Sequence, residues 1–242
     1  MSEEKVVMKG YKAFNKGMKC RDKQYAENTV FEEDSAEICK SGMHFCKNPL
    51  DIFDYYPLVN DKGEIPEFAE VEALDEVLTD DKKKYCTKKL KIGAKISLAG
   101  FIKASLNVTR KSIIKEAKEK GGNWAKLAGG NCAKLAGGDG ATLAGGDGAT
   151  LAGGNWAKLA GGYNAKLAGG YNATLAGGYN AIIAGDHGSI ARGKKGAVIL
   201  LVERNQKGEI SNFNAVQVDG EIIKEDTFYK LKNGEFVEVT NE

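Results

Sequence analysis

Apolar and small residues in the second half of the chain recur with a period of eight. Between residues 121 and 200 the phrase Gly-Gly-x-x-Ala-[Lys/Thr]-Leu-Ala repeats in ten consecutive octads, the last three of which are degenerate. Within each octad Ala and Leu alternate with Lys/Thr and Ala, as in a strand with one buried face. Glycines at the octad boundaries permit tight corners. A short fixed period of this kind predicts a β-solenoid.

The charges indicate how many octads make one coil. Coils stack about 4.8 Å apart, so like charges in successive coils repel each other. With two octads per coil no lysine lies on another, whereas three octads per coil would place Lys134 against Lys158. Two octads also place Gly140 between Trp124 and Trp156, which leaves room for both indoles. We predict 16 residues per coil and five coils in a rod about 24 Å long.

The outer side of the rod is the predicted binding surface. The leucines form the core, and the lysines must lie outside because a buried unpaired ammonium is costly. Asn and Asp at the third octad position are expected to form ladders at the corners, and the tyrosines an aromatic stripe on one half of the rod. Exposed aromatic residues often dominate binding energy, although the tryptophans could instead pack on neighbouring corners. The predicted surface comprises Trp124, Trp156, Tyr163, Tyr171, Tyr179, Lys126, Lys134, Lys158 and Lys166.

The segments around the repeat are irregular. Residues 1–100 are predicted to form an α+β unit, with strands over 6–15 and 67–74, one long strand or a strand pair over 85–98, and a short helix capped by Asn48. Residues 101–120 are predicted as an amphipathic helix that covers the first coil. Residues 201–242 are predicted as a β-hairpin unit that covers the other end, with hairpin turns at Asp219-Gly220 and Asn233-Gly234.

Composition and charge limit the partners and the cellular location that are expected for the protein. The chain has 35 Lys and Arg against 33 Asp and Glu, so no strong overall field attracts it to nucleic acid or membrane. No segment is apolar enough for a signal peptide or a membrane-spanning helix, and the five cysteines are an odd number. We therefore expect free thiols, a cytoplasmic location and no membrane partner. The sequence contains no cofactor motif.

The repeat resembles a known octapeptide. The phrase GYNATLAG at 170–177 is similar to the repeat of bacterial ice-nucleation proteins, a family whose resemblance implies a β-solenoid with 16 residues per coil. The similarity covers about a third of the chain. It departs where the second threonine of an ice-binding row is replaced by alanine, as at Ala128, Ala136 and Ala144. The resemblance therefore implies the coil and argues against an ice-binding face.

The flanking segments resemble another family. The runs at 9–25, 39–56 and 218–236 are similar to an uncharacterised family common in bacteriophages and prophages. The octads lie between these runs. The resemblance implies a phage-encoded accessory protein that acts in the cytoplasm of a host cell.

Residues 42–56 carry a further resemblance. GMHFCKNPLDIFDYY is similar to the Gly-x-[His/Tyr]-Phe-x-x-[Asn/Asp]-Pro-x-x-Ala-x-x-Tyr pattern of ADP-ribosyltransferase-type folds. The resemblance implies that Arg21, Tyr25, His44 and Tyr55 lie near a nicotinamide pocket. Such an enzyme also needs a late catalytic glutamate and a Ser/Thr strand, and the sequence places neither. The alternative is that the aromatic residues of this segment belong to the core.

Cysteines and a histidine suggest a metal site as another alternative. Cys20, Cys39, His44 and Cys46 offer thiolate and imidazole ligands suited to zinc. Their spacing differs from the usual Cys-x2-Cys arrangement. Free cysteine is also among the most frequently buried residue types. Core thiols and a hydrogen-bonded histidine are therefore the favoured interpretation, and no metal is expected.

The leading functional hypothesis is a non-enzymatic accessory protein. Its solenoid would bind a host protein or protein–RNA complex, for example to inhibit an antiviral defence system. The octads carry seven basic and three acidic residues, which argues against DNA mimicry, and direct nucleic-acid binding is expected to be weak or absent. An ADP-ribosyltransferase-like enzyme and a structural component of the virion are the alternatives. A homo-oligomer also remains open, because two rods can pair through their stripes.

Overall fold

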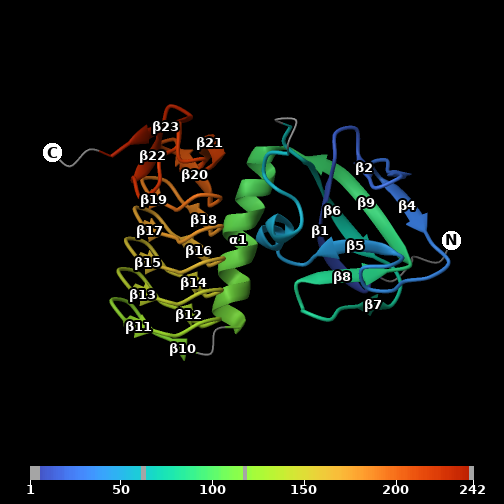
Figure 1. Ribbon diagram of the computed structural model, residues 1–242, viewed down its shortest axis with the longest axis horizontal. Coiled ribbons are helices and arrows are strands. Elements are labelled where there is room, and N and C mark those ends of the chain that lie inside the picture. Colours follow the sequence, from blue (N-terminus) through green and yellow to red (C-terminus); the bar gives the residue numbers. More distant parts are fainter. Residues whose placement is uncertain (1–5, 61–63, 117–118, 240–242) are drawn as a thin grey trace. The chain divides into compact units, whose positions relative to one another are not determined.

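The chain folds into two compact units, Met1–Phe101 and Ile102–Glu242, which are described separately (Figure 1). The computed structural model describes residues 6–60, 64–116 and 119–239. Among the helices in these ranges, none combines the length and the apolar character needed to span a membrane.

The first unit is built from short strands. They are β1 (Met8–Phe14), β2 (Lys19–Cys20), β3 (Lys23–Gln24), β4 (Thr29–Glu32), β5 (Met43–Cys46), β6 (Glu67–Ala73), β7 (Val77–Leu78), β8 (Lys84–Thr87) and β9 (Lys89–Ile96). Seven of them form one antiparallel sheet in the order β4-β9-β6-β1-β5-β8-β7, and β2 pairs with β3. The predicted strand pair over 85–98 is two strands, β8 and β9, that pair with different neighbours.

Both faces of this sheet carry a cluster of buried residues. Successive residues of a strand point to opposite faces, so Phe14 and Val71 pack in one cluster, whereas Ala13 and Phe68 pack in another with Phe101. The predicted helix after Asn48 is a 3-10 helix, η1 (Pro49–Asp54), and the Asn48 side chain caps it through the Leu50 N–H. The α+β character expected of this unit is not confirmed. Its described helical residues are those of η1 and the first turn of the following helix.

The second unit begins within that helix, α1 (Leu98–Glu116), and continues as strands. They are β10 (Glu119–Lys120), β11 (Lys126–Ala128), β12 (Lys134–Ala136), β13 (Thr142–Ala144), β14 (Thr150–Ala152), β15 (Lys158–Ala160), β16 (Lys166–Gly169), β17 (Thr174–Ala176), β18 (Ile182–Gly185), β19 (Ile190–Arg192), β20 (Val198–Arg204), β21 (Ile210–Gln217), β22 (Tyr229–Lys232) and β23 (Glu235–Glu238).

The β-solenoid predicted from the octads is confirmed. Strands pair in parallel with a shift of 16 residues, so that Lys126 lies beside Thr142 and Leu143 beside Leu159. One sheet has the order β10-β12-β14-β16-β18-β20-β21 and the other β11-β13-β15-β17-β19-β22-β23. Successive octads therefore alternate between two sheets, and two octads make one coil, as the charge argument requires.

The core between the two sheets consists of columns of Leu and Ala. Leu143, Leu151 and Leu159 are almost fully buried, and so are the alanines two positions before each leucine. The first glycine of an octad approaches the alanine four residues later. A Cβ at Gly145 would lie 2.5 Å from the Ala149 Cβ. The double glycine is therefore a packing requirement as well as a corner signal.

The outer sides of the two sheets differ. Ala128, Ala144 and Ala160 on one sheet are exposed, whereas Ala152 and Ala168 at the equivalent octad position of the other sheet are buried. Figure 1 shows α1 beside this second sheet, parallel to the direction in which the coils stack. We call the sheet of β10, β12, β14, β16, β18, β20 and β21 the covered sheet, and the other the open sheet.

The helix position differs from the expectation that residues 101–120 cover the first coil. A helix of 19 residues is about 28 Å long, which matches the side of a five-coil stack better than its end. It follows the side of the stack (Figure 1). Residues 117–118 of the predicted helix lie outside the described residues.

The C-terminal strands extend both sheets of the solenoid. β21 pairs with β20, and β22 pairs with β19. The predicted turn at Asn233-Gly234 joins β22 to β23, with φ angles of 55° and 82° that suit a two-residue hairpin. The hairpin turn predicted at Asp219-Gly220 is wrong. The Asp219 carboxylate accepts three backbone N–H groups from residues 221–223 and so closes a local loop instead.

Candidate functional site

The corners of the solenoid carry hydrogen-bonded ladders, as predicted. Turns before β11, β13, β15, β17 and β19 form the first corner, and turns before β12, β14, β16 and β18 form the second. At the first corner Asn123 Oδ1 accepts the Asp139 N–H at 3.0 Å, and Asp139 Oδ1 accepts the Asn155 N–H at 2.7 Å. Asn131 and Asp147 repeat the pattern at the second corner. These side chains fix each turn to the coil above it.

Two tryptophans occupy strained positions on the first corner. Trp124 and Trp156 have φ angles of 61° and 55°, where Gly140 and Asn172 stand in the equivalent turns. The two residues are 73% and 52% exposed. The Trp124 indole lies over Gly140, where a Cβ would overlap it, so Gly140 does leave room for the indole as predicted. Trp156 packs edge-on against Tyr171 with ring centroids 6.3 Å apart.

The tyrosines do not form one stripe. Because successive octads fall on alternate corners, Tyr171 continues the first corner after Trp156 and contacts His187, with ring centroids 5.5 Å apart. Tyr163 and Tyr179 lie on the second corner instead, and all three tyrosines are exposed. The predicted stripe on one half of the rod is therefore two separate rows.

The predicted lysines divide between the two sheets. Lys126 and Lys158 are exposed on the open sheet, and Lys134 is exposed on the covered sheet. Lys166 is only 5% exposed, on the covered sheet, so it does not belong to an accessible binding surface. The expectation that every octad lysine faces solvent fails there because that side of the solenoid is covered.

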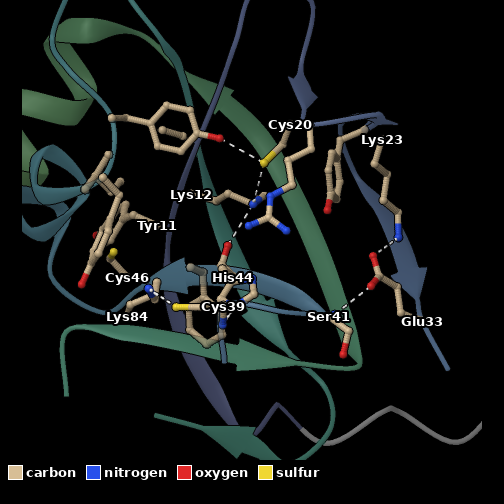
Figure 2. A pocket seen from close by; sticks show the side chains of 18 of the residues that line it. Tyr11, Lys12, Cys20, Lys23, Glu33, Cys39, Ser41, His44, Cys46 and Lys84 are labelled. Atoms are coloured by element: carbon tan, nitrogen blue, oxygen red, sulfur yellow. Dashed lines mark hydrogen bonds and ion pairs between the residues drawn. The ribbon is translucent and has the colours of Figure 1, made fainter. Parts of the chain in front are cut away.

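A second candidate site is a cavity of about 710 Å³ within the first unit (Figure 2). Strands β1 and β5 contribute to its wall, with the β2–β3 segment, the region after η1 and the start of β8. The cavity brings together all the candidate residues of the first unit, namely Arg21, Tyr25, His44, Tyr55, Cys20, Cys39 and Cys46.

A buried lysine lies at the wall of this cavity. Lys12 is 5% exposed and donates through Nζ to the His44 backbone carbonyl at 2.9 Å and to Cys20 Sγ at 3.6 Å. Its Nζ also lies 5.3 Å from the centre of the Tyr25 ring. Burial lowers the pKa of Lys12, and the charge of Arg21 adds to this effect. Among the ion pairs of the described residues, none includes Lys12.

The candidate zinc ligands contact other partners. Cys20 Sγ lies 3.0 Å from the Tyr56 hydroxyl, and Cys39 Sγ accepts a hydrogen bond from Lys84 Nζ at 3.0 Å. His44 Nε2 accepts the Cys39 backbone N–H at 3.0 Å. In the described ranges, no group of three or more His, Cys, Asp or Glu side chains could hold a metal ion. The four candidates share a cavity wall without converging on one point.

His44 is held neutral. Burial lowers its pKa most, and the charges of Lys12 and Lys84 lower it further. With Nε2 accepting a hydrogen bond, the single proton of the imidazole resides on Nδ1. His44 is thus a neutral group beside two ammonium groups, which suits it to positioning more than to proton transfer at neutral pH.

The tyrosines and the arginine differ in how they are held. The Tyr55 hydroxyl donates to Asp81 at 2.8 Å while Lys84 Nζ lies 4.7 Å from the centre of its ring. Burial raises the pKa of Tyr25 and that of Tyr55, so both remain protonated. Arg21 is exposed and has a φ of 54°. Its guanidinium makes no hydrogen bond or ion pair with another described residue.

Sequence reasoning missed Lys12, Tyr56 and Lys84. A signal for Lys12 exists, because alternation along β1 places it on the same face as Phe14, inside the sheet. A lysine in phase with core residues is unusual. Tyr56 and Lys84 reach the cavity through contacts between segments far apart in the sequence, which no local pattern reveals.

Comparison with known families gives a match over most of the unit that holds the cavity and the first residues beyond it. A family model described as a domain of unknown function (DUF7666) matches residues 8–104. Comparison with curated proteins and with solved structures gives no match for the chain. The octads lie outside the matched segment.

Proposed function

We propose that this is a non-enzymatic binding protein that presents the first corner of its solenoid to a macromolecular partner. The observation that carries the proposal is the placement of Trp124 and Trp156. A bulky residue in the left-handed region costs about 1–2 kcal/mol, a cost that Gly and Asn largely avoid. Exposure of an indole also forgoes the stabilisation of its burial. The fold needs neither feature, since Gly140 and Asn172 serve the equivalent turns.

The chemistry of the surface favours an acidic partner with apolar pockets. The first corner presents Trp124, Trp156 and Tyr171, and the open sheet next to it presents Lys126 and Lys158. Aromatic anchors supply affinity, and lysines at the rim steer association with negative charge. A host protein or protein–RNA complex has these properties, in agreement with the accessory role that the bacteriophage resemblance implies.

The test exchanges each tryptophan for the residue that other coils use. Trp124→Asn and Trp156→Asn keep a residue that tolerates the left-handed turn, so the solenoid should remain folded. Purified protein is used to capture partners from host lysate, and the captured component is then titrated against each variant. We expect the double variant to weaken binding at least tenfold. The matched control is Cys132→Asn, at the same turn position on the second corner, which should bind like the unmodified protein. Equal binding by the double variant would refute the proposal.

A second candidate function is ADP-ribosyl transfer in the first unit. The observation that favours it is that Arg21, Tyr25, His44 and Tyr55 line one cavity, as the resemblance of residues 42–56 implies. Incubation with labelled NAD and host lysate tests it. Transfer of label that is lost in Arg21→Ala would support this candidate. No transfer, or transfer unaffected by Arg21→Ala, would reject it.

A further inference from the structure

We propose that the cavity of the first unit binds a phosphate-bearing small molecule whose negative charge is held by Lys12 and Arg21. The proposal is independent of the solenoid surface. It concerns the same cavity as the transferase candidate, but it requires binding only and no reaction.

Lys12 forms no ion pair with a carboxylate among the described residues. A buried ammonium is costly unless an opposite charge accompanies it. The hydrogen-bond partners of Lys12 are a backbone carbonyl oxygen and the Cys20 sulfur, and neither is a carboxylate. An ammonium has three N–H donors, so these two contacts leave one donor for a ligand. An anion in the cavity would supply the missing charge.

Glu33, a carboxylate that could act as a counter-ion of Lys12, already has other partners. Glu33 lines the cavity, but its Oε1 pairs with Lys23 at 2.6 Å and its Oε2 accepts the Gly42 N–H at 2.9 Å (Figure 2). A carboxylate held by two donors in this way is already compensated. Asp22 is the other acidic residue of the lining, and the five basic residues exceed the two acidic ones, so the cavity has an excess of positive charge.

Arg21 lines the same cavity and has no hydrogen-bond or ion-pair partner within the part of the chain that the structure describes. The Arg21 charge lowers the pKa of Lys12, which means that the two cations repel each other. An anion bound by both would turn that repulsion into attraction. A guanidinium offers a planar fork of donors that matches two phosphate oxygens, and a buried ammonium offers a point charge. Together they suit a phosphate group better than a single carboxylate.

The walls of the cavity indicate the character of the rest of the ligand. The walls beside the charged end include Tyr11, Tyr25, Tyr55 and Tyr56. A cavity of about 710 Å³ lies within the range of pockets that enclose small molecules. Aromatic walls favour a flat ring system next to the phosphate. Both a free phosphate compound and the phosphate of a nucleotide share the chemistry that Lys12 and Arg21 recognise.

The experiment uses the full chain and three probes, which are inorganic phosphate, inorganic pyrophosphate and AMP. Binding is measured by calorimetric titration at low ionic strength, because salt screens such contacts. Saturable binding of any probe that Lys12→Met weakens at least tenfold, and Arg21→Gln at least threefold, supports the proposal. Binding of AMP alone assigns the nucleotide, whereas binding of pyrophosphate or phosphate assigns the free anion. Failure of the unmodified protein to bind all three would overturn it.

The matched control is Lys40→Met. Lys40 lines the same cavity, but it already forms an ion pair with Glu37. Its removal should change the dissociation constant of the same probe less than twofold. A loss equal to that of Lys12→Met would mean that general positive charge, and not the Lys12–Arg21 pair, attracts the probe, and the assignment would be wrong.

Thermal unfolding separates a ligand-binding role of Lys12 from a structural one. If Lys12 awaits an anion, Lys12→Met removes an uncompensated buried charge, so the unliganded protein should keep or raise its melting temperature while the probe-induced shift disappears. If Lys12 only holds His44 and Cys20 in place, the unliganded variant should be less stable and still bind the probe, which overturns the proposal. Should Lys12→Met fail to fold, the exposed Arg21→Gln variant decides. Unchanged affinity in that variant contradicts the proposal.

Discussion

The solenoid and the N-terminal sheet unit of this protein treat polar residues in opposite ways. In the solenoid, the columns between the sheets contain Leu143, Leu151 and Ala149, and corner amides are satisfied by a repeating ladder. In the sheet unit, Lys12 is buried on a core face of β1 and His44 is held neutral among cations. One unit maximises regular apolar burial, and the other accepts buried polar groups around a cavity.

This difference indicates where each unit places its chemistry. A regular core leaves only the outside of the solenoid for interaction, so its informative residues are those that break the regularity, such as Trp124 and Trp156. In the sheet unit the departures from good packing lie inside, around the cavity. Buried polar groups that do not serve the fold are expected at binding sites.

The largest effect on stability is expected from the replacement of a core leucine of the solenoid. Leu151→Ala deletes a fully buried side chain in the second coil, which should lower the free energy of unfolding of the solenoid by about 2–5 kcal/mol. Leu127 occupies the same position in the first coil and is only half-buried, so Leu127→Ala should cost about 1 kcal/mol. Both tryptophans of the chain lie in the second unit, so their fluorescence reports its unfolding in denaturant. Equal losses would contradict a core that is fully formed only in the inner coils.

A smaller effect tests the close packing at the glycines. Gly145→Ala would place a Cβ 2.5 Å from the Ala149 Cβ and 3.2 Å from Leu151 Cδ2. The resulting overpacking should cost about 1–3 kcal/mol. Gly130→Ala is the control, because a Cβ there meets no atom within 4 Å, and the change should be neutral or stabilise by less than about 1 kcal/mol. Tryptophan fluorescence again measures both. A neutral Gly145→Ala would show that the octad needs glycine only for its corner conformation.

Replacement of a lysine by threonine on each of the two sheets should give a still smaller difference in stability. Lys166→Thr removes a buried aliphatic stem from the covered sheet and should cost about 1–2 kcal/mol. Lys158→Thr changes an exposed residue of the open sheet to the threonine found in the neighbouring coils at Thr142 and Thr174, so its effect should stay within about 0.5 kcal/mol. The two midpoints of denaturant unfolding would coincide if the sheets were equally exposed.

The sequence was sufficient for the solenoid because each structural requirement repeats there. Leu, Ala and double Gly recur at fixed positions, and the alternation of Lys with Thr set the number of octads per coil. What the octads did not predict was the covered sheet. The burial of Lys166 depends on the side of the stack that α1 follows, which the repeat itself does not encode.

The sequence was much less informative about the cavity. Arg21, Tyr25, His44 and Tyr55 were candidates through a resemblance, and the structure places them together. Lys12 is the residue with the most unusual environment, yet its only signal is its phase along β1. The prediction of a hairpin turn at Asp219-Gly220 was wrong for a related reason. Its dipeptide matches a hairpin turn, but the partner strand of β21 is β20, which precedes it.

The smallest expected effect is a change in the pH dependence of the stability of the sheet unit. The pKa of His44 is lowered in the folded protein, mainly by burial, whereas an unfolded histidine titrates near pH 6.5. The unfolded chain therefore binds more protons between the two values, and the stability of the unit falls as pH drops below about 6.5. Calorimetric unfolding of the first unit at pH 7.5 and 5.5 should show this loss, and His44→Gln should reduce it. The solenoid transition, followed by tryptophan fluorescence, should respond equally to pH in both proteins. An unchanged pH response of the first unit in His44→Gln would mean that His44 is not held neutral by the cavity wall.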